Sequence, residues 1–84
     1  MKKLTVKYFA SIREALGTGQ ETLDTSATTV QALRDELVAR GGAYASSLAP
    51  GRAVRAALNQ VMVDGQAVLS DGAEVAFFPP VTGG

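Results

Sequence analysis

The segment Glu74-Val75-Ala76-Phe77-Phe78-Pro79-Pro80-Val81-Thr82-Gly83-Gly84 decides how this chain folds. Its first half is apolar after the initial glutamate, which is typical of a central strand that is buried on both faces. The two prolines then lack the amide hydrogens that a ladder needs, so strand pairing must stop at Phe78. We therefore expect one domain over residues 1–78 and an extended tail over residues 79–84.

Alternating side chains predict a strand near the start of the chain, over residues 4–10. Leu4, Val6 and Tyr8 point one way, and the residues between them, together with Phe9, point the other way. A second strand is expected over residues 20–25. It is rich in threonine and polar side chains, which indicates a sheet edge. The two strands should pair antiparallel.

A helix is predicted to follow, and its first turn carries a capping signal. Thr28 and Gln31 have the spacing of a capping box, in which each side chain satisfies a backbone N–H at the other position. Apolar side chains then recur at helical spacing at Val30, Leu33 and Leu37. Gly41 supplies a stop signal. A helix with one apolar stripe should pack against one face of a sheet.

The remaining elements are short. Helical turns are expected over residues 11–16 and 44–48, a strand over residues 57–63, and a shorter strand over residues 67–69. The predicted order is β-β-α-β-β-β. One main helix packed across a mixed sheet of four to five strands is an α+β architecture.

The composition excludes several classes of function. Eight basic residues balance eight acidic ones, and no basic face is visible, so nucleic acid is not an expected partner. The 84 residues include no cysteine and no histidine. This excludes a ferredoxin cluster, a thiolate zinc site and ordinary imidazole or thiol catalysis. Thr5 and Lys7 interrupt any early apolar run, so we expect no membrane span and a cytoplasmic protein.

The Gly83-Gly84 end is the most informative feature for function. Glycine has no Cβ, so such an end can enter a channel too narrow for other residues. A terminal carboxylate has an unperturbed pKa of about 3.3–3.7 and is a poor acyl donor when ionised. If a partner enzyme converted it to an acyl adenylate, sulfide could displace the nucleotide and leave a thiocarboxylate. The chain would then carry a reactive sulfur without any cysteine.

The segment 71–84 resembles the C-terminal signature of the small subunits of molybdopterin synthase. Residues 8–17, 29–34 and 57–60 are similar to the first strand, the helix start and the third strand of that family. The resemblance therefore extends over nearly the whole chain. It implies the β-grasp, or ubiquitin-like, fold.

The resemblance also implies a mechanism and partners. A ubiquitin-activating-type adenylyltransferase would use ATP and magnesium to adenylate Gly84, and a sulfur donor would convert the adenylate to a thiocarboxylate. The large synthase subunit would supply the catalytic side chains, in a heterotetramer, and sulfur would pass to cyclic pyranopterin monophosphate to build the molybdopterin dithiolene. The chain itself would be a non-catalytic sulfur carrier that binds no cofactor or metal.

Site residues follow from the same resemblance. Gly84 would carry the adenylate and then the sulfur. The residues that insert into the large subunit with it would be Gly83, Thr82, Val81 and Pro80. Phe77 and Phe78 are adjacent, so they face opposite sides of a strand and one of them should lie in the core. Partner contacts are expected at Phe78, Phe77 and Arg13, with Phe78 favoured over Phe77.

Three alternatives remain open on sequence grounds. A sulfur carrier of the thiamine pathway shares the fold and the Gly-Gly end, although it usually lacks the Phe-Phe-Pro-Pro-Val-Thr run. A ubiquitin-like modifier would form an isopeptide with target lysines. A pure interaction module would not need a free terminus at all. The fate of a charged Gly84 separates these possibilities.

Overall fold

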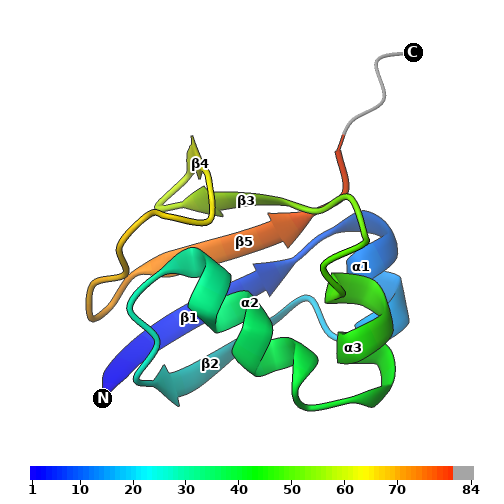
Figure 1. Cartoon of the computed structure of the whole chain (residues 1–84), viewed down its shortest axis with the longest axis horizontal. Coiled ribbons are helices and arrows are strands. Elements are labelled where there is room, and N and C mark those ends of the chain that lie inside the picture. Colours follow the sequence, from blue (N-terminus) through cyan, green and yellow to red (C-terminus); the bar gives the residue numbers. More distant parts are fainter. Residues whose placement is uncertain (81–84) are drawn as a thin grey trace.

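A computed structural model describes residues 1–80 as a five-stranded mixed sheet with helices on one face (Figure 1). The strands are β1 (Lys2–Tyr8), β2 (Gln20–Thr25), β3 (Arg55–Leu58), β4 (Val61–Val63) and β5 (Glu74–Phe78). The helices are α1 (Ala10–Leu16), α2 (Val30–Val38) and α3 (Gly42–Leu48). This arrangement confirms the predicted α+β β-grasp fold.

The sheet order is β2-β1-β5-β3-β4, which places β5 in the centre. β1 and β5 run parallel, with Tyr8 opposite Phe77, whereas β2 and β3 pair antiparallel with β1 and β5. The predictions of a central last strand, an edge strand at β2 and an antiparallel β1–β2 pair are confirmed. β1 begins two residues earlier than expected, because Lys2 pairs with Thr25.

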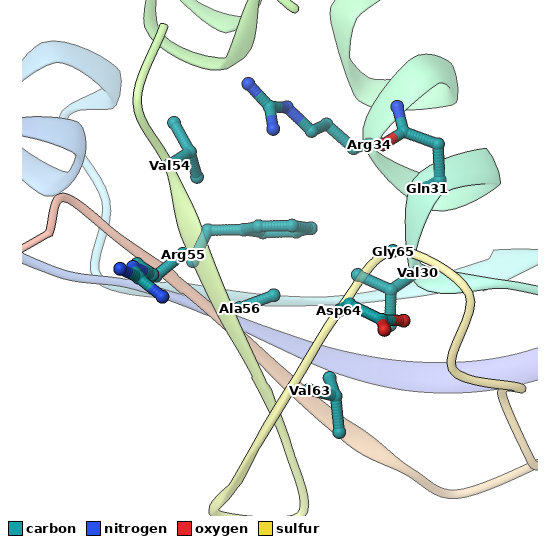
Figure 2. Close-up of a pocket in the computed structure, with 10 residues that line it drawn as sticks. Val30, Gln31, Arg34, Val54, Arg55, Ala56, Val63, Asp64 and Gly65 are labelled. Carbon is teal, nitrogen blue, oxygen red and sulfur yellow. The ribbon is translucent and has the colours of Figure 1, made fainter.

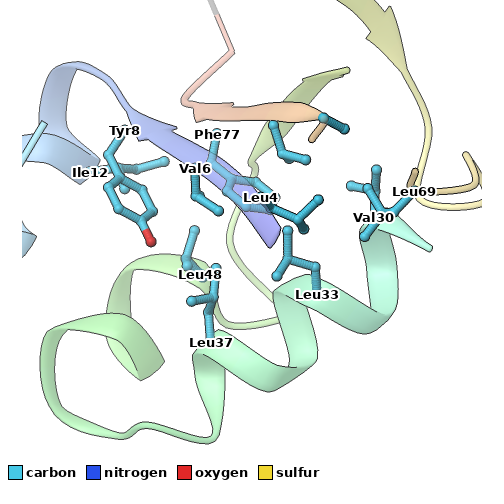
Figure 3. Packing of buried hydrophobic residues seen from close by; sticks show 12 residues of the cluster. Leu4, Val6, Tyr8, Ile12, Val30, Leu33, Leu37, Leu48, Leu69 and Phe77 are labelled. Carbon is cyan, nitrogen blue, oxygen red and sulfur yellow. The ribbon is translucent and has the colours of Figure 1, made fainter. Parts of the chain in front are cut away.

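The hydrophobic core lies between the sheet and the helices (Figure 3). Leu4, Val6 and Tyr8 enter it from β1, so the predicted alternation is confirmed. The apolar stripe of α2, made by Val30, Leu33 and Leu37, is also buried there as predicted. Leu48 of α3 and Phe77 of β5 complete the central layer.

The N-terminal cap of α2 differs from the predicted capping box. The cap is Thr29, whose Oγ1 accepts a hydrogen bond from the N–H of Ala32 at 3.1 Å. The carbonyl of Thr28 instead accepts from the N–H of Leu69, which keeps that residue in an extended segment outside the helix. The side chain of Gln31 donates to Asp35 rather than reaching back to the cap.

The predicted strand over residues 57–63 is wrong, because a tight turn divides it into β3 and β4. Asn59 and Gln60 have φ values of 50° and 69°, as the two central residues of a type I′ hairpin turn require. Asn59 also holds the start of β5: its N–H and its Oδ1 pair with the backbone carbonyl and N–H of Glu74, at 2.8 and 3.0 Å. Propensity alone could not place this turn.

Two further differences concern the short elements. The predicted turns around residues 11–16 and 44–48 are complete helices of seven residues each, α1 and α3. The expected strand over residues 67–69 is reduced to one bridge, between Val68 and Thr29. Thus α2 is the longest of three helices, rather than one main helix accompanied by isolated turns.

A polar cluster ties the core side of β1 and β2 to the ends of α2 and α3. The carboxylate of Glu21 accepts hydrogen bonds from the hydroxyls of Tyr8 and Tyr44 and from Arg40, each at 2.8 Å. The guanidinium of Arg40 also lies over the Tyr44 ring, 4.9 Å from its centroid. Glu36 lies four residues before Arg40 along the chain, but the ion pair of Arg40 is with Glu21. Glu36 instead accepts a hydrogen bond from the buried Thr25.

Changing Gln60 to glycine should stabilise the protein. A non-glycine residue at positive φ is strained, and Asn-Gly is the preferred pair for this turn. We expect Gln60→Gly to raise the free energy of unfolding by about 0.5–1 kcal/mol after the extra entropy of an unfolded glycine is subtracted. Denaturant unfolding measures the change. Gln66→Gly is the matched control, because Gln66 is not at positive φ; an equal gain there would contradict the explanation.

Acid should weaken the fold through Glu21. Burial by itself raises the pKa of this carboxyl, but the hydrogen bonds from Arg40, Tyr44 and Tyr8 outweigh burial and lower the pKa below its usual value. A lowered pKa in the folded state gives stability that is present at neutral pH and lost as the pH falls below about 4.3. Unfolding measured from pH 7 to pH 3 should show this loss.

The variant Glu21→Gln tests the assignment. At neutral pH it should lower the free energy of unfolding by about 1–2 kcal/mol, because it keeps the side-chain shape but removes the charge from three hydrogen bonds. Its stability should then change less between pH 7 and pH 3 than that of the wild type. An unchanged acid slope would show that other carboxyls dominate acid unfolding.

Candidate functional site

The candidate site begins where β5 ends. Phe78 pairs with Arg55 in the last register position of the β3–β5 ladder, and Pro79 and Pro80 follow without amide hydrogens. Both prolines are half-buried and lie outside the ladder. Pro80 is the last described residue. The predicted tail residues Val81, Thr82, Gly83 and Gly84 lie outside the described part of the chain, so the proposed tail boundary and their roles stay predictions.

The two adjacent phenylalanines have different environments. Phe77 is 1% exposed and packs in the core, so its ring is not available at the surface. Phe78 points to the opposite face of the sheet and is only half-buried. Of the two rings proposed as partner contacts, only that of Phe78 can meet a partner without unfolding the core.

Phe9 is a neighbouring surface aromatic to which sequence reasoning gave no role. It follows β1 in an extended conformation, and its N–H donates to the carbonyl of Phe77 at 3.2 Å. The parallel register therefore continues by one residue and puts Phe9 on the same face as Phe78. Its ring is 45% exposed. The alternation of β1 pointed Phe9 away from the core, but could not show that nothing covers it.

We call the sheet face opposite the helices the outer face. Phe78 and Ala76 of β5 lie on it, beside Arg55 and Ala57 of β3, and Met62 of β4 is opposite Ala57. The Met62 side chain is 56% exposed. With Phe9, the apolar side chains of Phe78, Ala57 and Met62 form a band across the sheet that ends at the root of the tail, and Arg55 borders it. An exposed apolar band of this kind is typical of a protein contact surface.

Arg13 lies beside this band. Its guanidinium passes over Gly19, where a Cβ would approach Nε to 3.3 Å. Arg13, Phe9 and Lys7 line one shallow hollow. Arg13 makes no ion pair within residues 1–80, whereas Lys7 pairs with Glu74 at 3.3 Å. The structure thus brings two predicted contacts, Phe78 and Arg13, to the neighbourhood of Phe9.

A groove of about 300 Å³ lies on the helical side, between α2 and the β3–β4 hairpin (Figure 2). Its lower wall is apolar, and its rim includes Gln31, Arg34 and Asp64. The Arg34 guanidinium donates hydrogen bonds to the carbonyls of Leu48, Ala49 and Arg52. These bonds fix the segment after α3, so we interpret Arg34 as a structural residue and assign the groove no chemical role.

Residues 1–80 contain neither a metal-binding cluster nor a membrane-spanning helix. No group of three or more aspartate or glutamate side chains is arranged to hold a metal ion in this part of the chain. Within the same residues no helix is long and apolar enough to cross a membrane. The candidate site consists of the outer face and the root of the tail.

Sequence comparison places these features in a known context. The model of the ThiS family matches residues 6–84. The chain is 43% identical over 81 residues to the molybdopterin synthase sulfur carrier subunit of Escherichia coli strain K12, which covers 96% of this chain and 99% of that protein.

Several solved structures also resemble this chain. The crystal structure of SAMP1 from Haloferax volcanii superposes with a TM-score of 0.78 at 26% identity, covering 98% of this chain and 99% of that one. A chain from the complex of subunits 1 and 2 of the molybdopterin-converting factor of Helicobacter pylori superposes with a TM-score of 0.67 at 25% identity. That match covers 98% of this chain and 99% of the other.

Truncation of each phenylalanine should distinguish the buried ring of Phe77 from the surface ring of Phe78. Phe77→Ala removes a fully buried ring and should lower the free energy of unfolding by about 3–5 kcal/mol. Phe78→Ala removes a half-exposed ring and should lower it by only about 1 kcal/mol. Denaturant unfolding of the two variants gives the comparison. Equal losses would contradict the strand register described above.

Proposed function

This chain belongs to the ThiS family, and from that membership we propose that it is the sulfur carrier subunit of a molybdopterin synthase. The observation that carries the proposal is the run Phe78-Pro79-Pro80-Val81-Thr82-Gly83-Gly84, in a chain 43% identical to a relative of that name. The run joins a surface aromatic, two stiffening prolines and two residues without side chains. Each part has a physical role in presenting a carboxylate to another protein.

In the proposed cycle, Gly84 is the acyl carrier. An adenylyltransferase catalyses attack of the Gly84 carboxylate on ATP, with magnesium, and pyrophosphate leaves. A sulfur nucleophile then displaces AMP from the acyl carbon and leaves a thiocarboxylate. The large subunit uses this sulfur to convert cyclic pyranopterin monophosphate to the molybdopterin dithiolene. The chain is consumed and recharged, while the catalytic side chains belong to the large subunit.

The absence of side chains on Gly83 and Gly84 supports this role. A narrow partner channel admits glycine backbone but not a Cβ, and glycine can adopt angles closed to other residues. Pro79 and Pro80 restrict the chain just before it and favour an extended course. We propose that Pro80, Val81 and Thr82 line the inserted segment and make backbone contacts with the partner.

The outer face would be the docking surface for the large subunit. Phe78, Phe9 and Met62 present an apolar band next to the root of the tail, and Arg13 lies at its side. Aromatic and arginine side chains are enriched where interfaces are strongest. A chain of the Helicobacter pylori complex of subunits 1 and 2, which matches this fold, supports a large-subunit partner. Docking through this band would position the tail before it reacts.

A second function has support from a specific observation. The Haloferax volcanii neighbour is a small archaeal modifier, and a modifier would pass its activated glycine to a lysine rather than to sulfur. Both functions use an adenylated Gly84, so the fold cannot separate them. The product that forms after charging does, and the following experiment detects either one.

Charging should be visible as a change in intact mass. Incubation of the full chain with ATP, magnesium, an activating enzyme and a sulfur source should raise its mass by about 16 Da, since one terminal oxygen is replaced by sulfur. Addition of the large subunit and cyclic pyranopterin monophosphate should return the mass to its original value. A stable adduct with another protein would favour the modifier, and no mass change under any condition would contradict both.

The variant Gly84→Ala tests whether the terminal residue must lack a side chain. It should unfold like the wild type yet lose most sulfur transfer, because the added methyl group obstructs the channel. Val68→Ile is the matched control: it adds one methyl group to a residue that is 70% exposed and lies in neither the tail nor the docking surface, so transfer should be normal. Full activity of Gly84→Ala would count against insertion of the tail.

A further inference from the structure

A second hollow, of about 370 Å³, lies at the root of the tail on the helical side of the sheet. One wall comes from α1, through Ser11, Ile12 and Ala15, and the other from the segment 51–54 that leads into β3. Pro79 also lines it, so the hollow reaches the point where the chain leaves β5. Most of its lining side chains are small, which leaves the backbone accessible to a neighbouring molecule.

Two arginines stand on either side of this root. Arg52 lines the hollow together with Pro79, and Arg55 is the register partner of Phe78 on the outer face. Both side chains are exposed. The ion pairs within residues 1–80 are Lys7 with Glu74 and Arg40 with Glu21, so neither arginine has a carboxylate partner in this part of the chain.

The backbone that carries Arg52 is held in place. The Arg34 guanidinium donates to the carbonyls of Leu48 at 2.7 Å, of Ala49 at 2.7 Å and of Arg52 at 3.0 Å. The N–H of Arg52 also donates to the carbonyl of Ala49 at 2.8 Å. The segment is therefore fixed to α2 before any partner arrives. A cation carried by a fixed backbone segment loses less entropy on binding than one on a mobile loop.

We propose that Arg52, Arg55 and the hollow between α1 and segment 51–54 form a collar that binds an acidic segment of the large subunit. This proposal rests on the proposed function. It adds that the surface beside the root of the tail is positively charged. Arg55 borders the apolar band, whereas Arg52 and the hollow lie on the helical side of Pro79 and so extend the contact surface beyond that band.

The chemistry of the collar favours carboxylates. A guanidinium forms paired hydrogen bonds with a carboxylate, and the apolar parts of the hollow, Ile12, Val54 and Pro79, suit the aliphatic stem of an aspartate or glutamate. A polyanion such as nucleic acid would need a continuous basic stripe, and the chain has zero net charge. Charges at the rim of an interface mainly govern association rate and salt dependence.

Charge reversal tests the collar. The double variant Arg52→Glu/Arg55→Glu should keep the unfolding midpoint of the wild type, because both side chains are exposed. Its affinity for the large subunit, measured by calorimetry at low ionic strength, should fall about tenfold or more, and the difference should shrink at high salt. Lys3→Glu is the control: it reverses an exposed cation at the opposite end of the parallel β1–β5 ladder and should change affinity less than about twofold.

The outcomes separate this proposal from the proposed function. If the wild type binds the large subunit and gives up its sulfur, but the double variant binds equally well, the collar is wrong and the carrier function stands. Loss of binding to the activating enzyme alone would overturn the choice of the large subunit as occupant. If the wild type neither gains sulfur nor binds a large subunit, the carrier function itself is wrong.

Discussion

Thr5 to Tyr8 of β1 pair in parallel with Glu74 to Phe77 of β5, and this ladder joins the two ends of the chain at the centre of the sheet. It fixes which side of β5 faces the helices. A shift by one residue would exchange Phe77 and Phe78 and put the wrong ring in the core. Because the pairing is so distant in sequence, its closure entropy must be offset by the core that it assembles.

Because of this ladder, the two faces of β5 have different environments. On the helical side, Phe77 packs with Leu33 and Leu48, and the Glu21 cluster secures the neighbouring edge. Within residues 1–80 no helix covers the outer face, which presents Phe78 instead. A tail that starts immediately after such a strand begins at a fixed position. Under the proposed function, the domain would position a short segment for chemistry that its partners carry out.

Much of this fold could be predicted from the sequence. The alternation in β1 and the apolar run before Pro79 determined the core faces and the central strand, because burial follows period-two patterns directly. The turn at Asn59-Gln60 was missed, since a left-handed glutamine has no sequence signal of its own. The cap at Thr29 was displaced by one residue, because the bridge between Thr29 and Val68 and the Thr28–Leu69 hydrogen bond decide where the helix begins.

The candidate site, like the fold, could be predicted from sequence only in part. The end of the central strand before Pro79 could be predicted from local sequence, whereas the exposed positions of Phe9, Met62, Arg52 and Arg55 could not. Each of these depends on register across strands that are far apart in the chain, or on what leaves a surface uncovered. Whether a ring is exposed depends on the whole fold. The sequence shows only which face of its strand the ring occupies.

The central claim is that the outer face and the tail act as one docking unit. Methyl NMR during titration with the large subunit tests it directly, because the chain has suitable methyl groups on both sides of the sheet. We predict that the resonances of Ala57 and Met62, on the outer face, shift or broaden, whereas those of Val38 and Ala45, on α2 and α3, change little. The reverse pattern, with Val38 and Ala45 perturbed and Ala57 and Met62 unchanged, would contradict this account.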